Sequence, residues 1–192
     1  FEYSTNEKVA LEVAGAASIS GLRSLTCMKH VGLNVASDTF MTYMYIGTRG
    51  GHIIISADDP SCHSSQNEQD NRYYAKFAKV ACIEPSDSQE SKDYLKAAYE
   101  ISQKYQVAVL FRMTTRICHS KGLVEFADRD EVGAKEYVKN PSKWIATPSN
   151  AKRLHPIVED KLVALEEFSN ETDLNYFEWN DKKIGIISSG VA

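Results

Sequence analysis

The four cysteines of this 192-residue sequence are far apart, and no two of them form a C-x-x-C pair. Zinc and iron–sulfur sites usually take their thiolates from such close pairs, so we expect neither kind of metal site within this chain. Scattered single thiols are also typical of reduced proteins rather than of a disulfide framework, and they favour a cytoplasmic location. Cys27 falls in an expected strand and is predicted to lie in the core.

Basic charge and long apolar runs are scarce as well. The formal net charge is −4, which provides neither the basic field that nucleic acid requires nor a polybasic membrane anchor. No apolar run approaches the roughly 20 residues of a membrane span, and no charged-then-apolar leader opens the chain. We therefore expect neither nucleic acid nor a membrane among the partners.

The two ends of the sequence predict a piece of a longer protein. The chain opens on Phe1 rather than Met, directly before a helical pattern, and it closes on the strand-like run Ile184–Gly190. Its length is sufficient for one good core with an appended segment. It contains no internal repeat of solenoid period and no low-complexity tract.

Helices and strands are expected to alternate between residues 5 and 113. Apolar and β-branched runs predict strands at Leu22–Met28, His52–Ser56, Val80–Ile83 and Gln106–Phe111. Helical spacing predicts helices at about 5–20, 34–46 (capped by Ser37 or Asp38) and 88–104, and another around Tyr73 and Phe77. This alternation favours an α/β fold with a mostly parallel sheet between two helical layers. Because the series opens on a helix, the preceding strand is expected upstream.

The chain changes character after residue 113. It becomes charged and turn-rich, with Pro141 and Pro148 as expected breakers, and one amphipathic helix is predicted at His155–Phe168. Tyr176–Trp179 and Ile184–Ile187 predict a hairpin or the start of a second domain. We thus divide the chain into a domain at 1–120 that lacks its first strand, an irregular linker at 121–182, and the start of a following domain at 183–192.

The first helix admits two interpretations of Glu7. Ser4 followed three residues later by Glu7 fits a capping box, in which both side chains satisfy orphan backbone N–H groups. The body of the helix is rich in small residues, including Ala10 and Ala14, so another backbone or a flat ligand can approach it closely. A carboxylate buried beside such a face would lower the stability of the fold. Such a position is, however, typical of a carboxyl group with a chemical role.

Three strings of the sequence carry a family resemblance. They are the first helix from Asn6 to Ala16, the run Met28–Asp38, and the run Asp58–Asp70 that contains Asp-Asp-Pro and His-Ser-Ser. Together they resemble the alpha subunit of indolepyruvate:ferredoxin oxidoreductase, a thiamine-diphosphate-dependent 2-oxoacid oxidoreductase. The resemblance covers most of the chain and is densest over residues 3–120.

The resemblance implies that residues 1–120 form a pyrimidine-binding domain and that Glu7 contacts the ring nitrogen of the aminopyrimidine. That contact promotes loss of the thiazolium C2 proton, after which the cofactor decarboxylates the 2-oxoacid. Electrons pass through iron–sulfur clusters outside this chain to ferredoxin, and the acyl group passes to coenzyme A. The expected protein partner is a beta subunit. His30, Gly32 and Asn34 are candidate cofactor contacts, or alternatively an ordinary turn and cap after the strand.

Further candidates follow from the expected sheet. In open α/β sheets, ligands bind beyond the carboxyl ends of the strands, where this chain places the polar stretches Lys29–Asn34, Ala57–Gln66 and Met113–His119. Substrate contacts are predicted for His63, Ser64 and Arg116, and Arg112 is a further candidate for the substrate carboxylate. Structural histidines and surface ion pairs are the competing interpretations.

The family's diphosphate signature, Gly-Asp-Gly with a downstream Asn, is absent from the sequence. Mg²⁺ and the diphosphate are therefore expected on a separate domain, and this chain alone is expected to be inactive. Oxidoreductases for pyruvate, 2-oxoglutarate or branched-chain oxoacids remain alternatives. A non-catalytic α/β dimerisation or interaction module is the alternative from another class.

Overall fold

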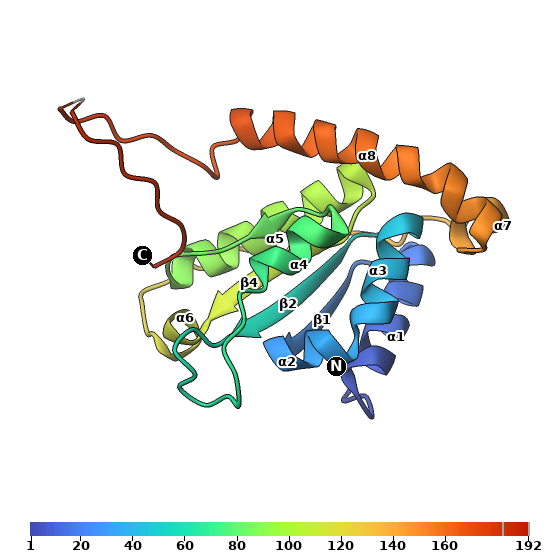
Figure 1. Cartoon of the computed structure of the whole chain (residues 1–192), viewed down its shortest axis with the longest axis horizontal. Helices are drawn as coiled ribbons and strands as arrows, with labels where there is room; N and C mark the ends of the chain where they lie inside the picture. Colours follow the sequence, from blue (N-terminus) through green and yellow to red (C-terminus); the bar gives the residue numbers. More distant parts are fainter. Residues whose placement is uncertain (182, 192) are drawn as a thin grey trace.

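The computed structural model describes residues 1–181 and 183–191; residues 182 and 192, the last residues of the predicted linker and following domain, lie outside the described residues. A four-stranded, all-parallel sheet forms the centre, in the order β1-β2-β4-β3. The strands are β1 (Ser24–Lys29), β2 (His52–Asp58), β3 (Cys82–Ile83) and β4 (Val109–Thr114). The predicted α/β fold with a parallel sheet is confirmed (Figure 1).

The described helices are α1 (Glu7–Ile19), α2 (His30–Val35), α3 (Ser37–Ile46), α4 (Arg72–Ala78), α5 (Ser88–Tyr105), α6 (Thr115–His119), α7 (Pro141–Trp144) and α8 (Pro148–Glu171). In the order β1-β2-β4-β3, the connection from β1 to β2 crosses the sheet in one direction, and the connection from β3 to β4 crosses it in the opposite direction. Right-handed crossovers therefore place α3 and α5 on opposite faces. The helix α1 packs beside α3 on β1 and β2, α5 packs on β2 and β4, and α8 contacts both α3 and α5.

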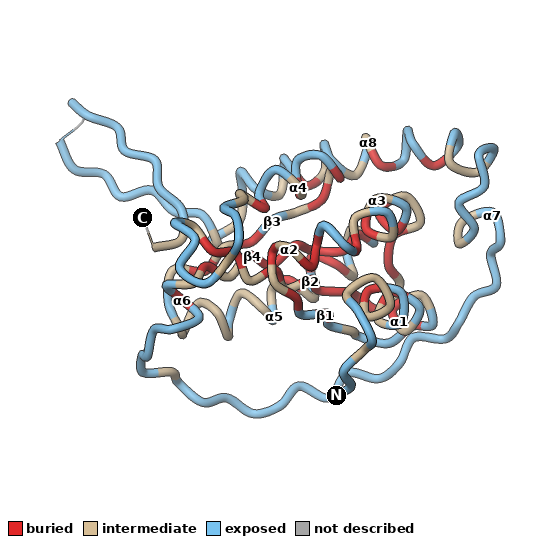
Figure 2. The backbone as a smooth tube through the Cα atoms, turned by 60° about the horizontal axis from the view of Figure 1, so that its bottom comes forward, coloured by how far each residue is buried: buried red, intermediate tan, exposed pale blue. Residues whose placement is uncertain are grey.

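The core lies between the sheet and these helices, as the buried segments in Figure 2 show. Ile53, Ile54, Val109 and Leu110 are fully buried, because β2 and β4 are the two central strands. Gly15 lies where an added Cβ would stand 3.3 Å from the ring of Tyr43, so the small-residue helix α1 is approached closely by α3 of the same chain. No helix of the described chain combines the length and the apolar character that crossing a membrane requires.

Cys27 corrects the expectation that it belongs to the core. It is exposed, because β1 is an edge strand that directs only Thr26 and Met28 inward and leaves Leu25 and Cys27 on the other side. An alternating pattern marks a strand, but it does not show which of the two faces another element covers.

Helix boundaries also differ from the sequence-based prediction. The N-cap of α1 is Asn6, whose Oδ1 accepts from the Val9 backbone N–H at 3.0 Å, so the Ser4–Glu7 capping box is wrong. The helix expected at 34–46 is two helices that meet at Ala36, without a side-chain cap from Ser37 or Asp38. Pro141 and Pro148 do not break structure but begin α7 and α8, as proline at the first helical position favours.

Strand β4 begins three residues after the predicted start, because α5 ends at Tyr105 with Gln106 in the left-handed conformation. The hairpin predicted near the C-terminus is wrong: among the described residues after Glu171 there is no strand, and Tyr176–Trp179 and Ile184–Ile187 are exposed. Apolar side chains in an extended segment resemble a strand in the sequence whether or not a pairing partner exists.

His52 is a buried polar side chain that connects β2 to its neighbours. Its Nε2 lies 2.7 Å from Thr26 Oγ1 and its Nδ1 lies 3.3 Å from the Tyr43 hydroxyl. The residue is fully buried, and this burial lowers the pKa of His52 to about 3. The ring is therefore neutral at physiological pH.

This shift makes stability depend on pH. The pKa of His52 is lower in the folded chain than the 6.5 expected of an unfolded one. The contribution of the neutral His52 ring to the free energy of unfolding is therefore fully present above pH 6.5 and is lost as the pH falls toward 3. We expect the free energy of unfolding to drop by about 2 kcal/mol between pH 7 and pH 5 in urea titrations. His52→Gln should be less stable at pH 7 but lose much less on acidification. His119→Gln, at an exposed histidine, should behave as the parent; equal acid sensitivity of all three chains would exclude His52 as the cause.

Candidate functional site

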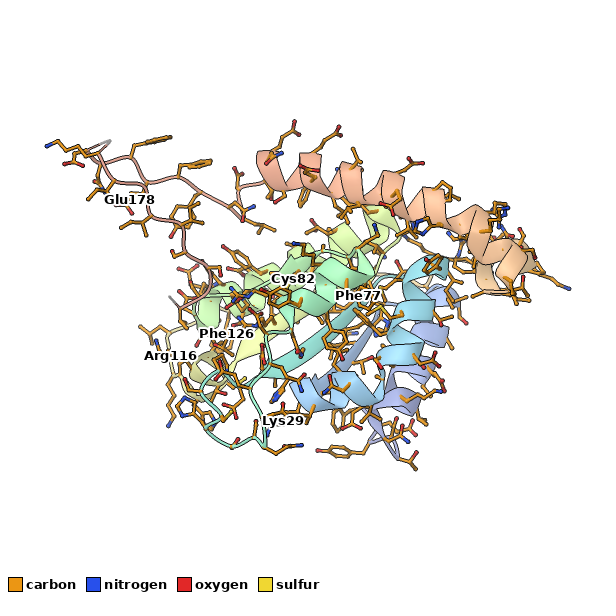
Figure 3. All side chains as sticks on the ribbon, in the orientation of Figure 1. Lys29, Phe77, Cys82, Arg116, Phe126 and Glu178 are labelled. Carbon is orange, nitrogen blue, oxygen red and sulfur yellow. The ribbon has the colours of Figure 1, made fainter. Side chains whose placement is uncertain are left out.

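The four parallel strands end at one edge of the sheet, and the arrowheads of β1, β2 and β4 point to the same side in Figure 1. Beyond this edge lie α2 after β1, the loop 59–71 after β2, Glu84 after β3, and α6 after β4. Figure 3 shows Lys29 and Arg116 on this side of the molecule. Because α1 runs back toward the start of β1, its first residue, Glu7, also lies near this edge.

Glu7 packs against Gly32 of α2. A Cβ atom added to Gly32 would stand 2.6 Å from Glu7 Cγ and 2.8 Å from Glu7 Oε1, so only glycine allows this approach. The Glu7 side chain is half-buried, and its carboxylate makes no hydrogen bond or ion pair with the described residues. The structure thus brings together two of the predicted cofactor contacts and leaves the carboxylate oxygens available.

The other two predicted cofactor contacts also lie within α2 rather than in a loop before a helix. His30 is fully buried, its Nε2 lies 3.2 Å from the Asn67 carbonyl oxygen, and its Nδ1 is buried without a partner among the described residues. Asn34 is exposed, and its Oδ1 accepts from the Tyr74 hydroxyl at 2.6 Å. His30 therefore retains one unused polar atom, whereas the carbonyl of Asn34 is already engaged.

Asp59 organises the loop that covers this edge. Its carboxylate accepts from Ser65 Oγ at 2.5 Å, from the backbone N–H of Ser64 at 2.8 Å and from Thr115 Oγ1 at 2.7 Å. These hydrogen bonds hold the pKa of Asp59 well below its usual range. Lys29 Nζ adds a bond to the Ser64 carbonyl oxygen at 2.5 Å, so the loop is fixed to β1 as well as to α6.

Arg112 is the centre of a buried ionic cluster beneath the loop. Its Nε donates to Asp58 Oδ2 at 2.8 Å and one terminal nitrogen donates to Glu84 Oε1 at 2.7 Å, and all three side chains are at most 10% exposed. Burial alone would lower the pKa of Arg112, but the two carboxylates more than offset this, so the guanidinium remains charged. Arg112 was a candidate for the substrate carboxylate; its charge is matched inside the protein instead.

A hollow of about 340 Å³ opens between the loop, the ionic cluster and α6. His63 and Arg116, both predicted substrate contacts, line it, whereas Ser64 does not. Thr114 and Glu84 also line the hollow, and each has a buried oxygen without a hydrogen-bond partner in the described chain. The described residues contain no group of three or more His, Cys, Asp or Glu side chains placed for a metal ion.

The sequence-based candidates omitted the residues that build this edge. Asp58 and Asp59 were noted only as part of a family string, and Glu84 and Thr114 were not noted, although each of the four is at or next to the carboxyl end of a strand. Their position after a buried strand could have identified the charged residues as candidates, since a charged residue there needs a partner or a ligand. Arg112 lies within β4, where a charge interrupts an apolar run, and that interruption is a second signal.

Comparison with known proteins places these features in context. No family model matches the sequence. Over its whole length the chain is 44% identical to the indolepyruvate oxidoreductase subunit IorA of Archaeoglobus fulgidus, 48% identical to that of Methanothermobacter marburgensis, and 45% identical to that of Thermococcus kodakarensis. The chain spans 31–32% of the length of these curated relatives. The resemblance found in three strings therefore extends over all of the chain.

Proposed function

We propose that the chain, which is similar over its whole length to curated indolepyruvate oxidoreductase subunits and spans about a third of their length, belongs to that family and forms the pyrimidine-binding part of a thiamine-diphosphate-dependent enzyme. The complete enzyme converts an aryl 2-oxoacid such as indolepyruvate to an acyl-CoA and passes the electrons to ferredoxin. Thiamine diphosphate, when bound, supplies the electron sink for the decarboxylation. Mg²⁺, the diphosphate site, the iron–sulfur clusters and the beta subunit belong to other parts of the assembly.

The available carboxylate of Glu7 is the observation that carries the proposal. This carboxylate has no hydrogen-bond or ion-pair partner in the described chain, so it is free to engage a ligand. The aminopyrimidine ring has a nitrogen that accepts a proton, and a carboxyl group can hold a proton at that nitrogen. Gly32 keeps the space beside Glu7 free of a side chain, and His30, two residues before Gly32, adds a buried nitrogen without a partner in the described chain.

The hollow beside Arg116 is the proposed position of the 2-oxoacid. Arg112 is neutralised by Asp58 and Glu84, and Arg72 is paired with Asp70 at 2.6 Å. Arg116 is exposed and makes no ion pair among the described residues, so it is the guanidinium that remains for a substrate carboxylate. His63 lies in the same wall and can donate a further hydrogen bond.

The direct experiment measures whether the complete enzyme needs the cofactor. Indolepyruvate-dependent reduction of ferredoxin should be lost when thiamine diphosphate is removed and should return when thiamine diphosphate and Mg²⁺ are added together. Activity that is unchanged by removal of thiamine diphosphate would refute the proposal. A non-catalytic interaction module would show neither the activity nor the binding of the cofactor, and comparison of pyruvate, 2-oxoglutarate and branched-chain oxoacids with indolepyruvate identifies the substrate class.

Arg116→Gln should raise the KM for the 2-oxoacid by about tenfold or more, because a charge-assisted hydrogen bond contributes about 1.5–3 kcal/mol. The kcat should not fall, since the carboxylate loses its charge as CO2 departs, so a contact to it supports substrate binding rather than the decarboxylation transition state. Arg129→Gln, which removes an exposed charge from the segment after α6, is the matched control. An unchanged KM in the Arg116 variant would place the substrate carboxylate elsewhere.

A further inference from the structure

The hollow beside Arg116 has a wall that is mostly polar or charged. Among the described residues that line it there is no phenylalanine, tyrosine, tryptophan, leucine or isoleucine, and its apolar side chains are Pro60 and Val191. An aromatic ring placed in this hollow therefore lies mainly against charged groups. The face of an aromatic ring carries partial negative charge, so the charged group that it contacts favourably is a cation.

Three arginines line the hollow, and they differ in what their guanidinium groups can still contact. The Arg112 side chain is 5% exposed and is surrounded by its own carboxylates. Arg116 is the guanidinium proposed for the substrate carboxylate. The Arg72 side chain is 50% exposed, so it is the cation that remains for the rest of the substrate.

Asp70 holds the guanidinium of Arg72 in a fixed plane. Arg72 Nε donates to Asp70 Oδ1 at 2.8 Å and Arg72 Nη2 donates to Asp70 Oδ2 at 2.6 Å, while the Arg72 backbone N–H donates to the same Oδ1 at 3.1 Å. Arg72 Nη1 donates to Ser189 Oγ at 3.3 Å. Bonds from a guanidinium lie in its plane, so these partners occupy its edges and not its faces.

The pair of Arg72 and Asp70 is also connected to the buried cluster beneath the hollow. Asp70 Oδ1 lies 4.0 Å from Arg112 Nε, so the carboxylate that orients Arg72 is attracted to a second cation. The hydrogen bonds to Asp70 raise the pKa of Arg72 further above its usual range, so the guanidinium keeps its charge. A charged plane that is fixed before the ligand arrives loses little side-chain entropy on binding.

We propose that Arg72 is a specificity-determining residue on which the aryl ring of the 2-oxoacid stacks, while Arg116 holds the carboxylate of the same molecule. The inference rests on the proposed function and names the contact that selects an aryl group. A branched aliphatic group has no negatively charged face, so the contact favours aryl over branched-chain oxoacids. Stacking also requires a planar cation, which arginine provides and lysine does not.

The first experiment measures the Kd of indole-3-propionate, an unreactive carboxylate without a 2-oxo group, for the complete enzyme by titration calorimetry. Arg72→Lys keeps a positive charge beside Asp70 but has no planar group, so the Kd should rise by about tenfold, within the range of a cation–π contact shielded from water. The Kd of the aliphatic carboxylate 4-methylpentanoate should not change. An equal Kd of indole-3-propionate in Arg72→Lys and in the parent would overturn the inference.

Arg23→Lys is the matched control for this substitution. Arg23 also lies over an aromatic ring, 5.1 Å from the centroid of Tyr99, but it stands just before β1, at the opposite edge of the sheet from the hollow. The same exchange at this position should leave the Kd of indole-3-propionate unchanged. A rise equal to that in Arg72→Lys would show that the effect does not come from the hollow, and it would overturn the inference.

The second experiment varies the charge on the face of the substrate ring. Fluorine atoms on the ring of phenylpyruvate withdraw charge from its face, so the KM of the parent should rise with their number, whereas the KM of Arg72→Met should stay nearly level. The same dependence on fluorine in both enzymes would overturn the inference and leave the proposed function intact. Binding of indole-3-propionate that depends on Arg72, in an enzyme that turns over no 2-oxoacid, would support the contact and contradict the proposed function.

Discussion

Glu7→Gln is expected to lower the turnover of the complete oxidoreductase by about 100-fold or more, the usual scale for a positioned proton-transfer group. Glutamine keeps the length and shape of the side chain that packs on Gly32. It cannot hold a proton at the aminopyrimidine nitrogen as a carboxyl group can. Because Asn6 rather than Ser4 or Glu7 caps α1, the substitution removes no capping bond. The free energy of unfolding should therefore change by no more than about 1 kcal/mol, the contribution of a charge in the first helical turn.

Glu12→Gln is the matched control for this substitution. Glu12 lies on the same helix, is exposed, and accepts from Thr39 Oγ1 at 3.0 Å. The substitution removes the same charge from α1 at a position about one and a half turns away from Glu7, and turnover should remain within about twofold of the parent. Equal losses of turnover in the two variants would show that the net charge of α1 matters rather than the position of the Glu7 carboxylate.

Arg112→Met is expected to destabilise the protein by about 3–5 kcal/mol, because it leaves two carboxylates buried without their cation. Asp58 and Glu84 are 0% and 10% exposed, and both bond directly to the Arg112 guanidinium. Methionine fills much of the volume of the arginine stem, so the loss should come from the unpaired charges rather than from a cavity. Urea denaturation at pH 7 measures the effect.

Removal of one carboxylate charge separates this origin of the effect from simple loss of packing. In an Asp58→Asn background one of the two unpaired charges is absent, so Arg112→Met should cost less stability than it does in the parent. Arg72→Met, which breaks an exposed ion pair with Asp70, should cost less than about 1 kcal/mol. An equal cost of Arg112→Met in the parent and in the Asp58→Asn background would attribute the loss to packing.

The central sheet was predictable because its signals are local. The β-branched run of β2 and the apolar run of β4 are buried on both faces, and their order along the chain follows from alternation with helices. The start of α1 was placed within two residues, but its cap was not, because Ser4 and Asn6 are both good caps and the backbone decides between them. The same limit applies to Cys27, whose exposure depends on which strand forms the edge.

The candidate site was predictable in position but not in its connections. The edge of the sheet followed from topology, His63 was named from its place at that edge, and Glu7 and Gly32 were named from family strings. The pairing of Arg112 with Asp58 and Glu84 joins residues 54 and 28 positions apart, and no local pattern encodes such contacts. The four bonds that Asp59 accepts are likewise set by how the loop folds back on α6.

The most direct test of the account is the rate at which the C2 proton of thiamine diphosphate, bound to the complete enzyme, exchanges with deuterium. This rate reports the proton transfer that Glu7 is proposed to support, and it requires neither 2-oxoacid nor ferredoxin. The account predicts that Glu7→Gln slows the exchange by about 100-fold while thiamine diphosphate still binds and the fold is retained. Exchange in Glu7→Gln as fast as in the parent would contradict the account.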